Sequence, residues 1–128
     1  ELAILTLGHI GNYAVEVCEK LETQGISIAH YDMRFAKPLD EEMLQEVFTR
    51  FKKVITIEDG CILGGFGSAV LEFMADHYYS SEVRRLGIPD SIIEHGEQIQ
   101  LHRESGFDPE GIKNAVMEML EPILKVRS

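Results

Sequence analysis

The chain has 128 residues, of which 45% are hydrophobic and 27% charged, so its composition fits one globular domain and excludes a disordered or fibrous polypeptide. Its 12 basic and 22 acidic residues give a formal net charge of −10, and the basic residues form no stripe that could bind nucleic acid. No apolar run approaches the ~20 residues that cross a bilayer, and the start ELAILTLGHIG lacks the features of a signal peptide. We therefore expect a cytoplasmic protein without nucleic-acid or membrane partners.

Strands and helices are predicted to alternate along the first half of the chain. The apolar run LAILTL (2–7) predicts a strand, and apolar residues at helical spacing then predict a helix that stops at Gly25. ISIAHYDM (26–33) predicts a second strand, after which Asp40 is a suitable N-cap for a second helix. KVITIED (53–59) is rich in β-branched residues and predicts a third strand.

The second half continues this alternation. SAVLEFMADHY (68–78) has apolar residues on one helical face, and EVRRLGIP (82–89) predicts a fourth, more polar strand near a sheet edge, which Pro89 stops. A short helix is expected around 97–104. A longer one is expected from Asp108, where DPEG supplies an N-cap followed by proline at the first helical position.

This alternation predicts the fold class. Strands that are apolar on both faces must be covered on both sides, which indicates an α/β domain with three α/β/α layers around a mostly parallel sheet of four to five strands. No internal repeat or linker divides the sequence, so we expect one domain over 1–128. Ligands of such sheets favour the carboxyl ends of the strands, which directs attention to 8–12, 32–34 and 58–67.

The loop after the first strand offers a possible nucleotide or anion site. In GHIGNYA, Gly8 and Gly11 lead into a helix, but the middle glycine of a GxGxxG fingerprint is missing. Asp32 ends the second strand, where an acidic residue that binds ribose would lie. Asp32 and Arg34 are alternatively a solvated or interfacial ion pair. Both interpretations stay open from the residues alone.

The stretch EDGCILGGFGSAV (58–70) is rich in glycine, and it either cradles a phosphate or lets a strand turn tightly into a helix. It lacks the GK[ST] ending of a Walker loop, and Glu58 and Asp59 would repel an anion at close range. Free amides at the helix start could still hold an anion. We favour a structural turn, in which glycines permit a sharp bend and close backbone packing. The glycines of this turn are Gly60, Gly64, Gly65 and Gly67.

No catalytic or metal-binding constellation is evident in the sequence. The five histidines do not have the spacing of a zinc site, and Ser68 does not lie in a GxSxG nucleophile elbow. Cys18 and Cys61 lack CxxC spacing and are expected to be reduced thiols. We therefore assign no catalytic, cofactor-binding or metal-binding residue. Gly8, Gly11, Asp32, Arg34, Glu58 and Asp59 remain candidates for a ligand site or an interface.

Five sequence blocks carry a family resemblance: LAILTLGHIGNYA, YDMRFAKPLD, ITIEDGCILGGFGSAVLEFMADH, VRRLGIPDSIIEHG and ESGFDPEGI. In order and spacing they resemble the C-terminal domain of the 1-deoxy-D-xylulose-5-phosphate synthase family, within the transketolase-like, thiamine-diphosphate-dependent enzymes. The resemblance covers about residues 2–112. The chain starts without Met and lacks the antiparallel strand that begins the familiar domain, so we expect a fragment of a longer enzyme.

The resemblance implies a function for the longer enzyme rather than for this segment. Such transferases condense pyruvate and glyceraldehyde 3-phosphate, with loss of CO₂, in the synthesis of isoprenoid and thiamine precursors. Their thiamine diphosphate and Mg²⁺ are bound by the preceding domains, so this segment is expected to hold no cofactor and to be inactive alone. It would pack against the remaining domains and within a homodimer. The alternatives are a regulatory nucleotide or anion module, or a protein-docking domain like that of 2-oxoacid dehydrogenase E1 β-subunits.

Overall fold

The computed structural model describes residues 2–7, 11–33, 40–61, 65–88 and 108–127. Within them, four strands form one parallel sheet in the order β2-β1-β3-β4. The strands are β1 (Leu2–Leu7), β2 (Ile28–Met33), β3 (Lys53–Cys61) and β4 (Glu82–Ile88). The helices are α1 (Gly11–Glu22), α2 (Glu41–Arg50), α3 (Phe66–Asp76) and α5 (Pro109–Arg127). The expected α/β class with a parallel sheet is confirmed.

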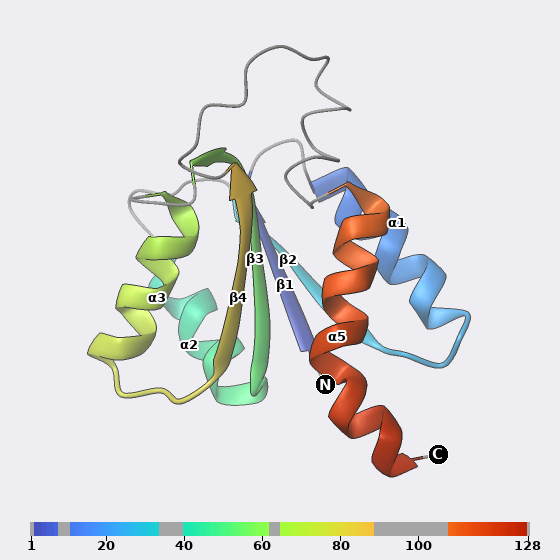
Figure 1. Ribbon diagram of the computed structural model, residues 1–128. Helices are drawn as coiled ribbons and strands as arrows, with labels where there is room; N and C mark the ends of the chain where they lie inside the picture. The colour runs from blue at the N-terminus through green and yellow to red at the C-terminus, as the bar shows by residue number, and fades with distance from the viewer. Residues whose placement is uncertain (1, 8–10, 34–39, 62–64, 89–107, 128) are drawn as a thin grey trace.

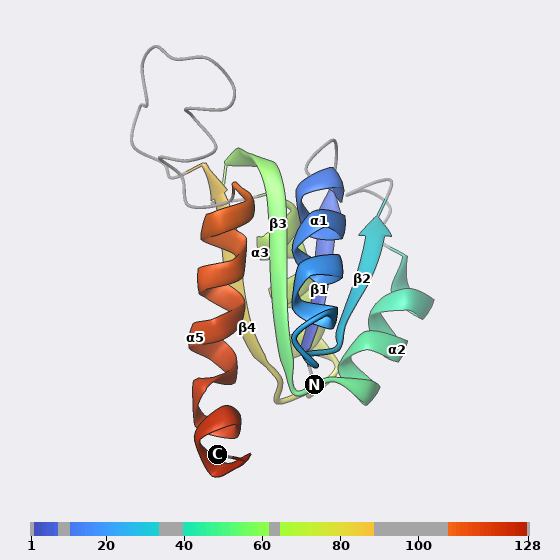
Figure 2. The same cartoon turned by 90° about the vertical axis from the view of Figure 1, so that its right-hand side faces the viewer.

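The helices cover both faces of the sheet, which gives three layers. Helices α1 and α5 lie side by side on one face, and α2 and α3 cover the other (Figures 1 and 2). Because all pairings in the sheet are parallel, the four strands begin at one edge, the amino-terminal edge, and end at the opposite carboxyl-terminal edge. Right-handed crossovers through helices make this the ordinary arrangement for such a chain.

Strand β1 lies at the centre of the molecule. Its side chains alternate between the two faces, and residues 2–6 are all buried. Leu2 and Ile4 belong to the core under α1 and α5, whereas Ala3 and Leu5 belong to the core under α2 and α3. This two-sided burial explains why LAILTL is a continuous apolar run rather than an alternating one.

Local sequence signals fix the ends of several helices. Gly25 has φ +81°, and Ile26 donates its amide to the carbonyl of Leu21, as in a Schellman motif that ends α1. At the start of α2, the amide of Met43 donates to Asp40 Oδ1 at 3.0 Å. At the start of α5, the amide of Gly111 donates to Asp108 Oδ1 at 3.0 Å. Both aspartates therefore act as the N-caps expected from the sequence.

The observed boundaries differ from the expected ones in three places. Helix α3 spans Phe66–Asp76 instead of 68–78, because its amides are capped by Glu58 from Phe66 onward. Strand β2 begins at Ile28 instead of residue 26 because Ile26 is engaged in the end of α1. Strand β3 continues to Cys61 instead of 59, with an irregular register between Ile57 and Cys61. The polar strand β4 lies at a sheet edge, as expected. The short helix expected around 97–104 lies outside the described residues. None of the helices described is long and apolar enough to span a membrane.

Candidate functional site at the carboxyl-terminal edge of the sheet

The turn from β3 into α3 is organised by a buried carboxylate. Glu58 is only 6% exposed, and its two carboxylate oxygens accept hydrogen bonds from the amides of Phe66 at 2.6 Å and Gly67 at 3.2 Å. The N-cap residue Gly65 has no side chain that could accept these bonds. Glu58 therefore satisfies two amides that would otherwise lack partners at the helix start, and its charge interacts favourably with the helix dipole.

Helix α3 approaches the sheet closely through Gly67. A Cβ atom at this position would lie 2.8 Å from Thr56 Oγ1 and 3.0 Å from Cγ and Cδ of Arg85. The hydroxyl of Thr56 is buried and has no hydrogen-bond partner among the described residues. Arg85 donates from Nη1 to Ser68 Oγ at 3.1 Å. Glycine is thus required sterically at position 67, where helix and sheet meet.

A second polar group lies on the opposite face of the sheet, at the start of α1. His30 Nε2 of β2 lies 2.7 Å from Thr6 Oγ1 of β1, and Thr6 is fully buried. A Cβ atom on Gly11 would be 3.4 Å from that hydroxyl and 3.8 Å from His30 Cε1, so the helix start rests against this pair. Burial lowers the pKa of His30, and the nearby charge of Asp32 partly opposes this shift. The neutral imidazole is therefore favoured.

The sheet separates the residues that the sequence had singled out into two groups. Gly11 and Asp32 lie towards α1, with Asp32 exposed and paired in register with Thr6. Glu58 and Gly67 lie towards α3, and Glu58 is paired in register with Leu7. The two groups therefore lie on opposite faces of the sheet, near the same carboxyl-terminal edge.

The remaining candidates are placed as follows. Gly65 is the N-cap of α3, whereas Gly60 lies inside the irregular end of β3 and therefore not in the turn where we expected it. The backbone of Asp59 also belongs to β3. Gly8, Arg34 and Gly64 lie outside the described residues.

Sequence reasoning missed two of these roles. We read Glu58 as a charge that would repel an anion, but its carboxylate is itself the anion at the helix start. The available signal was the lack of any capping side chain in GGFG, which requires an acceptor from elsewhere. We considered His30 only among the five histidines, whose spacing does not fit a zinc site. Its position opposite Thr6 could have been found only from the register of β1 and β2.

The contacts of these side chains do not favour the binding of a metal ion or a phosphate. Among the described residues, no cluster of three or more His, Cys, Asp or Glu side chains could hold a metal ion. The amides of Phe66 and Gly67 are already engaged by Glu58, so the start of α3 does not present them to a phosphate.

Comparison with known proteins places the chain in a family. The family model described as the transketolase C-terminal domain matches residues 1–112. A protein of Cytophaga hutchinsonii named 1-deoxy-D-xylulose-5-phosphate synthase is 59% identical over 125 residues, which is 98% of this chain and 20% of the relative. The protein of the same name from Bacteroides fragilis is 53% identical over 91% of this chain and 18% of its own length. The chain thus spans about a fifth of the length of these relatives.

A solved structure agrees with this assignment. The structure described as "Split gene transketolase, inactive beta4 tetramer" has 30% sequence identity and a TM-score of 0.82, and it covers 94% of this chain and 38% of that one. The chain therefore belongs to the family of transketolase C-terminal domains, on the branch that includes the 1-deoxy-D-xylulose-5-phosphate synthases.

Proposed function

We propose that residues 1–128 form the C-terminal domain of a 1-deoxy-D-xylulose-5-phosphate synthase, and that this domain supports the fold and assembly of the enzyme rather than its chemistry. The whole enzyme would condense pyruvate and glyceraldehyde 3-phosphate with loss of CO₂. The observation that carries this proposal is the 59% identity with a protein of that name across almost the entire chain. The relatives' shared name favours it over the E1 β-subunit and nucleotide-module alternatives.

The geometry of the glycine turn supports a structural role for this segment. Glu58 occupies the amides at the start of α3, and Gly67 allows that helix to approach Thr56 of β3 and Arg85 of β4 closely. Such an arrangement stabilises the backbone, which supports a structural turn.

The described residues do not fit the cofactors that the family implies. Thiamine diphosphate and Mg²⁺ need phosphate-binding donors and oxygen ligands grouped together, and neither the Glu58 carboxylate nor the isolated His30–Thr6 pair supplies them. We therefore place both cofactors in the polypeptide that the relatives have in addition to this segment, and we derive no catalytic step here.

The proposed partners are the remaining domains of the same enzyme and a second copy in a cytoplasmic homodimer. The net charge of −10 supports the proposal that nucleic acid is not a partner.

Two measurements test this function. The coding sequence before Glu1 is first read for a thiamine-diphosphate-binding GDG motif, which we expect to find. The 128-residue chain and the longer protein are then assayed with pyruvate, glyceraldehyde 3-phosphate, thiamine diphosphate and Mg²⁺. We expect product only from the longer protein. Product from the 128-residue chain alone, or a longer protein that is inactive while folded and loaded with cofactor, would contradict the proposal.

The nucleotide alternative has its own measurement. Calorimetry of the 128-residue chain with nucleotides and isoprenoid diphosphates at millimolar concentration is expected to give no binding heat. A saturable signal that Asp32→Asn abolishes would instead support a regulatory site beside α1.

A further inference from the structure

Tyr78 adopts a backbone conformation that its residue type disfavours. It follows α3 with φ +61°, and no other non-glycine residue among those described has a positive φ. The amide of Tyr79 donates to the carbonyl of Met74 at 3.0 Å, and that of Tyr78 to the carbonyl of Ala75 at 3.2 Å. This is the Schellman geometry in which glycine normally occupies the left-handed position. Tyrosine there costs conformational free energy that glycine would avoid.

The side chain of Tyr78 is also almost completely exposed. Its exposed fraction is 95%, whereas Val15, the other large hydrophobic residue exposed among those described, is 44% exposed. The next residue, Tyr79, instead packs on the core and stacks on Phe48 with ring centroids 5.6 Å apart. The chain therefore presents one ring outward at a strained position and gains no contact from it within the described structure.

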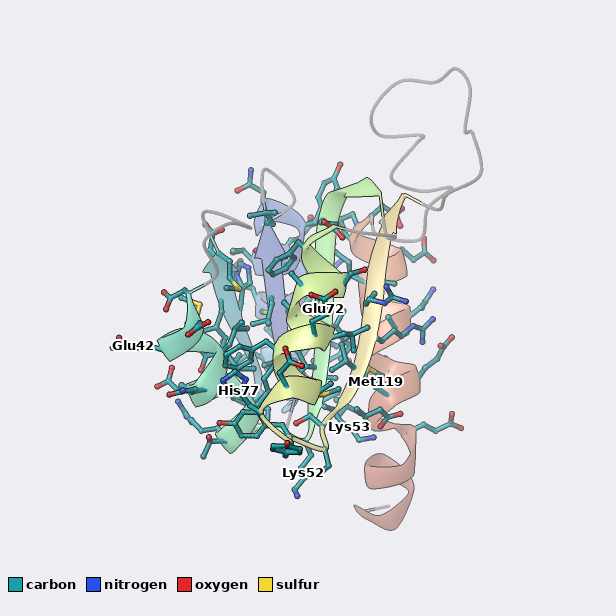
Figure 3. The ribbon with its side chains drawn as sticks, turned by 90° about the vertical axis from the view of Figure 1, so that its left-hand side faces the viewer. Glu42, Lys52, Lys53, Glu72, His77 and Met119 are labelled. Carbon is teal, nitrogen blue, oxygen red and sulfur yellow. The ribbon has the colours of Figure 1, made fainter. Side chains whose placement is uncertain are left out.

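Hydrogen bonds hold the turn that contains Tyr78 at the amino-terminal edge of the sheet. The turn that contains it is joined to the turn between α2 and β3, because Ser81 Oγ donates to the carbonyl of Phe51 at 2.9 Å and the amide of Glu82 donates to the carbonyl of Lys52 at 2.7 Å. Lys53 pairs with Glu82, whereas no ion pair within the described part of the chain involves Lys52. In Figure 3, Lys52 extends from this edge, away from the sheet.

The nearby helical surface carries exposed acidic residues. The outward residues of α2 and α3 include Glu42 and Glu72, which Figure 3 shows on the outer side of these helices. The amino-terminal edge instead presents the exposed ring of Tyr78 and, on the adjoining turn between α2 and β3, Lys52. An exposed tyrosine ring is typical of a protein interface, where aromatic residues are enriched, whereas glutamate is depleted at interfaces and is typical of a surface that stays in water.

Strand register shows which polypeptide reaches this edge. Ala3, Val54 and Val83 lie in one row across β1, β3 and β4, so Leu2 is level with Lys53 and Glu82. Glu82 is only four residues after Tyr78. Any polypeptide that precedes Leu2 must therefore enter at the amino-terminal edge, two strands away from the start of β4. The relatives are about five times as long as this chain, since it covers 18–20% of them.

We propose that Tyr78 and Lys52 form a docking surface for the polypeptide that precedes Leu2 in the longer enzyme. This inference rests on the proposed function, because it assumes that the segment is the C-terminal part of a synthase. The ring of Tyr78 packs against an apolar surface of the preceding domain, and Lys52 faces an acidic group of it. Burial of the ring compensates for the strained backbone that the isolated domain retains.

Hydroxyl-radical footprinting of the longer protein tests this surface directly. Oxidation of Tyr78 is compared with that of the half-buried Tyr79 in the same molecule, and with that of Tyr78 in the 128-residue chain. If Tyr78 docks, it should oxidise no faster than Tyr79 in the longer protein. In the 128-residue chain, Tyr78 should oxidise several-fold faster than it does in the longer protein. If Tyr78 oxidises several-fold faster than Tyr79 in the longer protein, the docking surface does not exist.

The substitution Tyr78→Gly gives a second test, with opposite signs in the two proteins. Removing the strain should raise the melting temperature of the 128-residue chain, whereas losing the docked ring should lower that of the longer protein. Val15→Ala, at the other exposed apolar side chain, is the matched control and should change neither. A rise in both proteins would overturn the inference.

Failure of this inference can be distinguished from failure of the proposed function. An active synthase whose Tyr78 oxidises freely refutes the docking surface alone. A longer protein without synthase activity refutes the proposed function, and a protected Tyr78 in that protein would still support the docking surface.

Discussion

The carboxylate of Glu58 lies 2.6 Å from the backbone nitrogen of Phe66, so a residue at the end of one strand completes the start of the helix that follows. The helix would otherwise begin at Gly65, which cannot cap it with a side chain. This contact links the acidic and the glycine-rich halves of EDGCILGGFG into one structural unit.

Removal of this carboxylate should therefore destabilise the domain. Glu58→Ala leaves two amides without partners in a buried setting, and we expect it to lower the free energy of unfolding by about 1–3 kcal/mol. Glu58→Gln, which keeps one acceptor oxygen, should cost less. Urea unfolding measures both, with Glu72→Ala on the exposed face of α3 as the matched control. Equal urea midpoints for Glu58→Ala and Glu72→Ala would refute the capping role.

Gly67 should be more sensitive to added volume than its helical position suggests. Gly67→Ala places a methyl group 2.8 Å from Thr56 Oγ1, and we expect a loss of about 1–3 kcal/mol of unfolding free energy. Thr56→Ala removes the nearest of the three contacting atoms, so the double variant should recover part of the loss in a double-mutant cycle. Additive effects of the two substitutions would show that the contact with Thr56 is not the cause.

Gly25 provides a contrast to Gly67. A Cβ atom there would meet nothing within 4 Å, but the residue has φ +81°. Gly25→Ala should therefore cost about 1–2 kcal/mol through backbone strain alone. Because no neighbouring side chain is involved, no second substitution should rescue it. Restoration of the unfolding free energy by truncating an adjacent side chain would contradict this explanation.

Local sequence patterns predicted much of this fold because they are set by residues close together in the chain. LAILTL, the N-cap Asp40 and the stop at Gly25 each describe a single element, and the structure has β1, α2 and the end of α1 at those positions. The polar composition of β4 also predicted its place at an edge, because edge strands tolerate charged side chains.

The features that sequence reasoning missed depend on pairs of distant residues. Glu58 caps a helix that starts eight residues later, and its charge alone suggested the opposite role. The extension of β3 to Cys61 depends on pairing with Ile88 of β4, which no local pattern contains. His30 and Thr6 are 24 residues apart and meet only through the strand register. Such relationships arise from topology, so a single sequence identifies their chemistry only after the fold is known.

The environment of His30 predicts a pH dependence of stability. Burial lowers its pKa, so the folded chain binds the imidazole proton less readily than the unfolded chain. In the unfolded chain, the histidine has a pKa of about 6.5. The contribution of the neutral His30 to the free energy of unfolding is therefore fully present above that pH, and it is lost as the pH falls below it. His30→Gln should lose less unfolding free energy than the wild type between pH 7.5 and pH 5.5, as measured by urea unfolding. Equal losses in the two proteins would contradict the prediction.

Asp32 should moderate this effect. Its charge raises the pKa of His30 against the larger effect of burial, so Asp32→Asn should shift the NMR titration midpoint of His30 further down. Asp40→Asn, which removes an acidic charge elsewhere and retains an N-cap, is the control. A midpoint that moves upward in Asp32→Asn would exclude the assigned interaction.

Cys18 should be a slow thiol nucleophile. Burial raises its pKa, and the charges of Glu19 and Glu22 raise it further, so little thiolate is present at neutral pH. In a Cys61→Ser background, where Cys18 is the one remaining cysteine, its reaction with a disulfide reagent at pH 7.5 should be several-fold slower than that of a free thiol peptide.

Two further measurements separate the burial of Cys18 from its electrostatics. Unfolding in urea should accelerate the reaction, because it exposes the sulfur and unfolds helix α1, which holds Cys18 and both glutamates close together. Glu22→Gln should accelerate it less, since burial is the larger cause of the raised pKa. A folded-state rate equal to that of the peptide would show that neither burial nor nearby charge lowers the reactivity of the sulfur. An acceleration by Glu22→Gln as large as that in urea would show that charge, rather than burial, controls the reactivity of this thiol.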